Sequence, residues 1–147
     1  MVTVLKITHP DSERQWQQYY QLRWRVLRAP WDQPVGSERD ALEDKSEHVM
    51  VLSDTEQLLG VGRVHFNNEE QAQIRYMAVD EQVRGYGVGT ILLTELEAIA
   101  RKQGASVVVL DARENAVSFY AGHGYQVIAD GHTLYGVIHH KKMLKNL

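Results

Sequence analysis

The sequence contains no cysteine, and this absence excludes several kinds of protein. A disulfide-stapled scaffold, a metal site built on thiolates and a cysteine nucleophile all require that residue. Only 3 prolines occur in 147 residues, and no stretch is rich enough in proline, serine or glycine to form a linker. We therefore expect a single domain over residues 1–147, long enough to bury its own core without covalent staples.

Long apolar runs and an excess of basic charge are also missing. No wholly apolar run exceeds the length of Val107–Leu110, which is far short of the ~20 residues that cross a bilayer. The first residues lack the basic and then apolar order of a signal peptide. The net charge of -3 disfavours broad attraction to nucleic acid or anionic membranes. We expect a cytoplasmic protein that binds neither nucleic acid nor a membrane.

Hydrophobic periodicity predicts seven strands and three helices, with a short acidic segment after the first helix. The expected strands are Val2–Thr8, His48–Leu52, Leu58–Phe66, Ala72–Val79, Ser106–Leu110, Tyr125–Ala129 and one from about 133 to 144. The expected helices begin near Ser12, Gly89 and Asn115. This order favours an α+β (α/β/α) domain, in which helices cover both faces of a mixed, mostly antiparallel sheet of six to seven strands.

The strongest chemical signal is Arg84-Gly85-Tyr86-Gly87-Val88-Gly89-Thr90, which lies between an expected strand and an expected helix. Glycine allows sharp turns and a close approach of the backbone to a ligand. The first turn of a helix adds unpaired N–H groups and a positive dipole end. The segment therefore indicates a site for a phosphate or pyrophosphate, although three glycines can also serve a tight turn alone.

Two familiar phosphate-binding loops do not fit this segment. A P-loop needs a lysine after its last glycine, where this chain has Thr90-Ile91. The dinucleotide fingerprint needs a third glycine where this chain has Thr90 or Leu92. Asp111, at the end of the next strand, stands where a ribose-binding acid would be, so a dinucleotide-binding fragment stays open as one alternative.

The spacing that fits is Arg84-x-x-Gly87-x-Gly89, and the segment Met77–Leu93 resembles the acyl-coenzyme A loop of the GNAT superfamily of N-acetyltransferases. A second segment resembles that family's other hallmark, with Asn115 and Tyr120 on a helix followed by Gly124-Tyr125. Tyr125 replaces the usual phenylalanine. The resemblance extends over about residues 58–144, with both motifs in the expected order.

The resemblance implies that acetyl-CoA is the acyl donor. Backbone amides would hold its pyrophosphate, and they belong to Arg84, Gly85, Tyr86, Gly87, Val88, Gly89 and Thr90. The strand before this loop would splay from the next strand, so that backbone groups of Met77, Ala78 and Val79 meet the pantetheine arm and the thioester carbonyl. Asn115 would contact the coenzyme, unless it only caps a helix.

Tyr120 matches the family's tyrosine that protonates the departing thiolate, although a tyrosine on this apolar helix can also serve the core. The general base stays open, because Gln73–Tyr76 on the strand before the loop contains no acid. The candidate bases are His65, Glu47 or a water molecule, and Glu43 and Asp44 are further candidates. His139 and His140 point to opposite faces of a strand and cannot share a metal. We predict no metal.

The acceptor is expected to be an amine of a small molecule or a peptide, attacking the thioester directly in a ternary complex. The acidic segment 38–47 suits a cationic acceptor, but we expect it to be a solvated surface loop. Arg23, Arg25 and Arg28 would favour an anionic acceptor instead. A coenzyme A-binding regulatory domain without turnover is the alternative function, and a homodimer is compatible with either.

Overall fold

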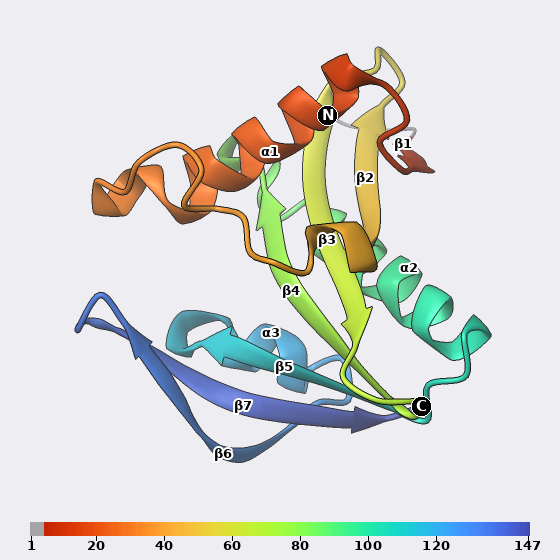
Figure 1. Ribbon diagram of the computed structural model, residues 1–147, viewed down its shortest axis with the longest axis vertical. Helices are drawn as coiled ribbons and strands as arrows, with labels where there is room; N and C mark the ends of the chain where they lie inside the picture. The colour runs from red at the N-terminus through yellow and green to blue at the C-terminus, as the bar shows by residue number, and fades with distance from the viewer. Residues whose placement is uncertain (1–4) are drawn as a thin grey trace.

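The computed structural model describes residues 5–147, which form a seven-stranded sheet with helices on both faces (Figure 1). The strands are β1 (Leu5–Thr8), β2 (Glu47–Ser53), β3 (Leu58–Phe66), β4 (Gln71–Val79), β5 (Val107–Arg113), β6 (Gln126–Leu134) and β7 (Ile138–Asn146). The α-helices are α1 (Glu13–Leu27), α2 (Val88–Lys102) and α3 (Val117–Ala121). Short 3-10 turns cover Ala29–Trp31, Glu43–Lys45, Glu81–Val83 and Glu114–Ala116. The predicted fold class is confirmed.

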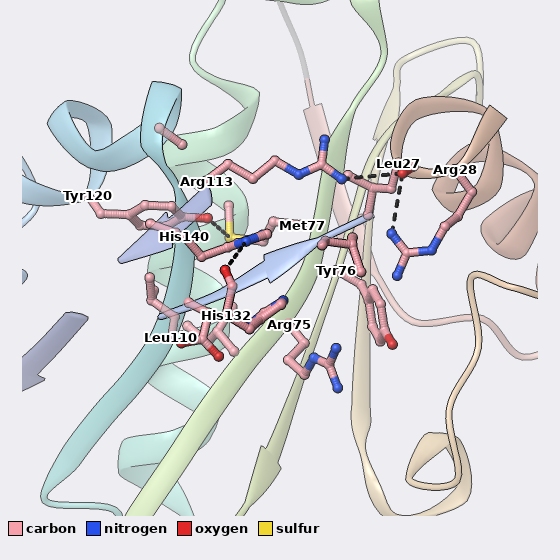
Figure 2. A pocket seen from close by; sticks show the side chains of 15 residues that line it. Leu27, Arg28, Arg75, Tyr76, Met77, Leu110, Arg113, Tyr120, His132 and His140 are labelled. Carbon is pink, nitrogen blue, oxygen red and sulfur yellow. Dashed lines mark hydrogen bonds between the residues drawn. The ribbon is translucent and has the colours of Figure 1, made fainter. Parts of the chain in front are cut away.

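The sheet opens between β4 and β5. The strand order is β1-β2-β3-β4-β5-β7-β6, and only β4 and β5 run parallel. Their pairing covers three residue pairs, from Gln71↔Val107 to Gln73↔Val109. Beyond Gln73 the two strands diverge (Figure 1), and side chains of both line the space between them (Figure 2). The expected splayed central pair is therefore present.

A bulge at Tyr76 accompanies this opening. Val61 and Arg63 of β3 pair with Ala78 and Arg75, so β4 carries one extra residue between these pairs. Tyr76 has a left-handed φ of 58°, a conformation that costs a non-glycine residue roughly 1–3 kcal/mol. Because a bulge bends its strand and increases the local twist, it directs β4 away from β5.

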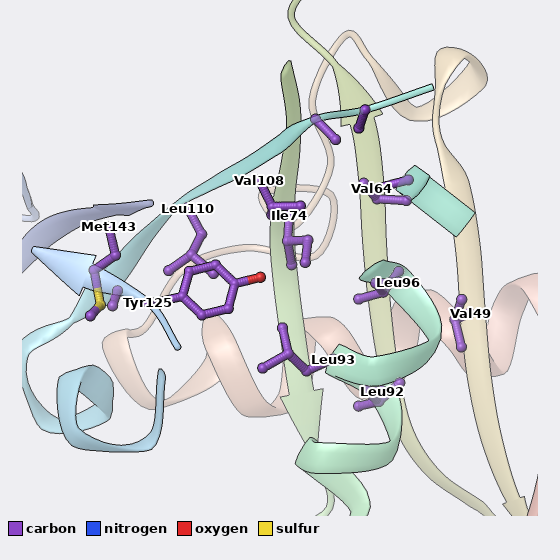
Figure 3. Close-up of a cluster of buried hydrophobic side chains, with 14 of the residues drawn as sticks. Val49, Val64, Ile74, Leu92, Leu93, Leu96, Val108, Leu110, Tyr125 and Met143 are labelled. Atoms are coloured by element: carbon purple, nitrogen blue, oxygen red, sulfur yellow. The ribbon is translucent and has the colours of Figure 1, made fainter. Parts of the chain in front are cut away.

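Two clusters of buried apolar side chains hold the helices against the sheet. The larger cluster lies between α2 and the sheet, where Leu92, Leu93 and Leu96 pack near Ile74 (Figure 3). The three- and four-residue spacing of apolar side chains in α2 turns these leucines to one side of the helix. The smaller cluster surrounds Tyr19 of α1 on the opposite face of the sheet. The three-layer arrangement follows from these two apolar helix faces.

The acidic segment 38–47 is the predicted solvated loop only in part, since Asp44 and Glu47 are exposed whereas Asp40 and Glu43 are paired with arginines. Glu43 binds Arg23 at 3.0 Å and Arg63 at 2.9 Å, and both arginines are fully buried. Asp40 binds Arg63 at 2.7 Å and Arg75 at 3.0 Å. Burial raises the pKa of Asp40, but hydrogen bonds from Arg63 and the Leu42 N–H, together with the charges of Arg63 and Arg75, outweigh it, and the pKa falls to about 2. These carboxylates neutralise arginines of the core, so they do not serve to attract a cationic acceptor.

The ends of the predicted strands differ from the observed ones chiefly in the last three strands. The strand predicted to end at Leu110 continues to Arg113. The last two strands meet in a hairpin, in which β6 runs to Leu134 and Tyr135 and Gly136 form the turn with positive φ values. Such a turn joins twisted antiparallel strands directly. Of the predicted first strand, residues 2–4 lie outside the described residues.

Gly60 leaves room for the first turn of α2. A Cβ atom at position 60 would lie 2.7 Å from Cγ1 of Val88 and 2.9 Å from Cδ1 of Leu92. Val88 is β-branched, so a rotamer change does not relieve this contact easily. We expect Gly60→Ala to lower the free energy of unfolding by about 1–3 kcal/mol, measured by urea denaturation. Gly122→Ala, where the nearest atom would be 3.4 Å away, is the control. An unchanged midpoint for Gly60→Ala would contradict the tight contact.

Candidate active site

The glycine loop presents an array of unpaired backbone N–H groups. Gly85 and Gly87 have φ values of 85° and 86°, and Gly87 caps α2. Within residues 5–147, no acceptor pairs with the N–H groups of Gly85, Gly87, Val88, Gly89 and Thr90. A Cβ atom at Gly85 or Gly87 would meet nothing within 4 Å, so the loop is open at these positions. With the positive end of the α2 dipole, these groups make an anion-binding surface.

Helix α3 packs directly against this loop. A Cβ atom at Gly89 would lie 3.2 Å from Cζ of Phe119, so the glycine allows the aromatic ring to approach. The hydroxyl of Thr90 lies 3.1 Å from Nε2 of His123, whose Nδ1 donates to the Phe119 carbonyl at 2.9 Å. These contacts fix α3, and therefore Tyr120, beside the first turn of α2.

The edge of β4 that faces β5 carries free backbone groups beyond Gln73. The N–H group of Asp80 donates to the Leu59 carbonyl at 2.8 Å, on the β3 side. Since N–H groups alternate between the two edges of a strand, those of Met77 and Val79 face the β5 side. This is the edge geometry that a polar, extended ligand needs in order to pair with the strand.

The diverging strands enclose a cavity of about 170 Å³. Its lining comes from the end of α1, from β4, β5, β6 and β7, and from the α3 region (Figure 2). Met77 of β4 and Tyr120 of α3 are among the lining residues. The polar and charged lining residues are Arg28, Arg75, Tyr76, Asp111, Arg113, Tyr120, His132 and His140.

Tyr120 lies at the meeting point of β4 and α3. Its hydroxyl donates to Sδ of Met77 at 3.6 Å, and its ring contacts Phe119 and Tyr125 edge-on. Burial raises the pKa of Tyr120 to about 12, so the phenol is protonated at neutral pH. The side chain packs against the core and also lines the cavity. Its position is therefore compatible with both roles that the sequence left open, core packing and proton donation.

His140 is the lining residue best able to accept a proton. Its Nδ1 donates to the carbonyls of His132 and Ile138 at 3.1 and 3.0 Å, so its proton resides there and Nε2 retains its lone pair. The rings of His132 and His140 stack with centroids 4.2 Å apart. Burial, with the charge of His132 next, lowers the pKa of His140. The imidazole is therefore neutral at pH 7.

The first two bases predicted from the sequence, His65 and Glu47, lie elsewhere, and neither Glu43 nor Asp44 lines the cavity. His65 is buried, and both ring nitrogens are engaged, Nδ1 by Arg63 at 3.3 Å and Nε2 by Asn67 at 3.1 Å. Glu47 is exposed at the start of β2 and accepts from Gln103 at 3.4 Å. Neither side chain lines the cavity. Asn115 is exposed in the turn before α3 and caps neither helical segment there.

The histidines of the described residues do not gather around a common point. Over residues 5–147, no three histidine, aspartate or glutamate side chains are arranged to hold a metal ion. The same part of the chain has no helix long and apolar enough to cross a membrane.

Comparison with known proteins identifies the family. The model of the acetyltransferase (GNAT) family matches residues 16–125. The chain belongs to the GNAT acetyltransferase family. It is also 32% identical to the uncharacterized N-acetyltransferase YjcF of Bacillus subtilis (strain 168), over 97% of this chain and 100% of that protein. The resemblance seen in the sequence is confirmed, and acyl transfer is the enzyme class of this GNAT member.

Solved structures share the fold at lower identity. A putative N-acetyltransferase from Lactobacillus plantarum aligns with a TM-score of 0.85 at 23% identity, over 99% of both chains. An aminoglycoside 6'-N-acetyltransferase complexed with coenzyme A aligns with a TM-score of 0.80 at 16% identity, over 96% of both chains. These two alignments show that the GNAT fold extends over nearly the whole chain.

Proposed function

We propose that this GNAT family member transfers an acetyl group from acetyl-CoA to the amine of a small molecule or peptide. The observation that carries the proposal is that α3, which packs against the unpaired N–H groups of Gly85 and residues 87–90, also carries Tyr120, which lines the cavity. The coenzyme A bound to the structurally similar aminoglycoside acetyltransferase supports the choice of donor. The loop from Arg84 to Thr90 binds the pyrophosphate, and Asn115 contacts the coenzyme.

The reaction proceeds by direct attack within a ternary complex. The amine nitrogen bonds to the thioester carbon, and the backbone N–H of Met77, on the edge of β4 that faces β5, stabilises the oxyanion; that of Ala78, which the sequence also suggested, faces β3 instead. The carbon–sulfur bond then breaks, and Tyr120 donates its phenolic proton to the departing thiolate. A thiolate formed in the same buried space is also poorly solvated, so its pKa rises as that of the phenol does.

The proposal assigns proton removal from the amine to His140 instead of His65 or Glu47. Its Nε2 is free to accept because Nδ1 is held by two carbonyls. Its lowered pKa keeps the basic form present at neutral pH and somewhat below pH 6.5. The amine loses one proton to His140, and the thiolate gains one from Tyr120. The imidazolium of His140 then gives its proton to solvent and the Tyr120 phenolate takes one from solvent, which restores both groups.

Replacing His140 with glutamine is expected to lower kcat by about tenfold, less than the full effect of a general base because water also accepts the proton. In the wild type, activity falls as pH drops through the lowered pKa of His140; in the variant, this acidic limb is lost. The measurement is thiol release over pH 5–9 with saturating acetyl-CoA. His139→Gln, on the exposed side of the same strand, is the control. Identical pH profiles for wild type and His140→Gln would contradict the assignment.

The function itself is tested by thiol release from acetyl-CoA across a panel of amines, with mass spectrometry of the products. Amide products from at least one amine are expected. Tight binding of acetyl-CoA without release on any amine would favour the regulatory domain instead.

A further inference from the structure

Two arginine side chains of the cavity have no carboxylate to neutralise them. Arg28, Arg75 and Arg113 all line it. Arg75 is paired with Asp40 at 3.0 Å, whereas within residues 5–147 neither Arg28 nor Arg113 forms an ion pair. The acidic lining residue Asp111 is bound to neither of them. This end of the cavity is therefore positively charged.

The two guanidinium groups converge on one backbone oxygen. Nη1 of Arg28 and Nη2 of Arg113 donate to the Leu27 carbonyl at 3.3 and 3.2 Å (Figure 2). Leu27 is the last residue of α1, so its carbonyl belongs to the negative end of the helix dipole. A carbonyl carries only a partial charge. It orients the two cations toward each other without neutralising them.

Holding two cations together in a partly buried place is unfavourable in the absence of an anion. Only 8% of Arg28 is exposed. Burial, and next the charge of Arg28, lowers the pKa of Arg113. Arginine nevertheless stays protonated in proteins. The fold does supply counter-ions to its structural arginines, since Glu43 and Asp40 bind the buried Arg23 and Arg63. The unneutralised pair faces the cavity instead.

We propose that Arg28 and Arg113 bind an anionic group of the acceptor, a carboxylate or a phosphate, so that the substrate is a small amine bearing an acidic group. This inference rests on the proposed function of the same cavity. Arg113 pairs with His140 across β5 and β7, so an anion held by Arg113 brings the rest of the acceptor next to the proposed base. A cavity of about 170 Å³ suits a molecule the size of an amino acid.

The test compares matched acceptors in the thiol-release assay. An amino acid is compared with its carboxamide, and 2-aminoethyl phosphate with ethanolamine, which separates the two anion chemistries. We expect kcat/KM to be at least tenfold higher for the acidic member of one pair. Arg113→Gln should raise KM for that substrate about tenfold or more and raise KM for the neutral partner far less, with Arg113→Lys restoring part of the loss. Arg101→Gln, on the exposed end of α2, is the control.

A binding measurement keeps this test independent of turnover. The N-acetyl amino acid and N-acetyl-2-aminoethyl phosphate, the two expected products, are titrated against wild type and Arg113→Gln by calorimetry. If no amine is acetylated but a product binds and Arg113→Gln abolishes binding, the proposed function fails and the anion site stands. If neutral and acidic amines react equally well, and Arg113→Gln changes neither, the anion site is wrong while acetyl transfer stands. Absence of both binding and preference for acidic amines would overturn the inference outright.

Discussion

Replacing Gly87 with glutamate is expected to abolish coenzyme binding, with a loss of affinity of about 10³-fold or more. The residue has a φ of 86° and a Cβ position with no atom within 4 Å. If the loop binds the pyrophosphate as proposed, a carboxylate at this position repels it from the N–H groups of the first turn of α2. Losing two charge-assisted hydrogen bonds amounts to about 4 kcal/mol, which corresponds to about 10³-fold.

Two controls separate this effect from backbone strain. Gly104→Glu places the same residue at a glycine with a φ of 100° and an equally open Cβ position, at the far end of α2. It should leave affinity for acetyl-CoA unchanged. Gly87→Ala tests strain without charge and should cost far less affinity than the glutamate. Calorimetry with acetyl-CoA gives the comparison, and equal affinities for wild type and Gly87→Glu would refute the assignment of the loop.

Removing the hydroxyl of Tyr120 is expected to reduce kcat by about 10²-fold or more while leaving the affinity for acetyl-CoA nearly unchanged. The phenol lines the cavity, and its only hydrogen bond within residues 5–147 is the long contact of 3.6 Å to Met77. Phenylalanine therefore preserves the packing and removes the proton donor. The measurements are kcat from thiol release and the dissociation constant of acetyl-CoA.

The neighbouring Tyr125 provides a matched control for this substitution. Its ring lies 5.8 Å from that of Tyr120, but its hydroxyl donates to Glu97 at 2.8 Å, away from the cavity. Tyr125→Phe should reduce stability and leave kcat within about twofold. If Tyr120→Phe behaved in the same way, Tyr120 would be a core residue only.

The sequence predicted the local features of this protein better than its long-range ones. The glycine loop and α2 depend on residues close together in the chain, and their spacing and periodicity were sufficient to place them. The motif around Tyr120 was found through its resemblance to the GNAT family. Alternation also predicted correctly that His139 and His140 face opposite sides of their strand, one exposed and one buried. The stacking of His132 on His140 depends on the register of β6 against β7, which irregularities shift in two places. No pattern in the sequence fixes that register.

The acidic segment was misjudged in part, for a related reason. Asp40 and Glu43 lie 20 or more residues from their partners Arg23 and Arg63, and a buried ion pair leaves no periodic signal in the chain. Arg28 and Arg113 are 85 positions apart in the numbering and meet only because α1 ends over the opening between β4 and β5. The arginines of the expected first helix suggested an anionic acceptor. No pattern in the sequence indicated that Arg113 lies beside Arg28.

Calorimetric titration of the wild-type protein with acetyl-CoA, and separately with acetyl-pantetheine, tests the central claim most directly. Acetyl-pantetheine carries the same thioester but lacks the pyrophosphate. We expect saturable binding of acetyl-CoA, one molecule per chain, and an affinity for the truncated compound at least about 10²-fold weaker, since the loop's N–H groups then have no anion to bind. No heat with acetyl-CoA, or equal affinity for the two compounds, would contradict that claim.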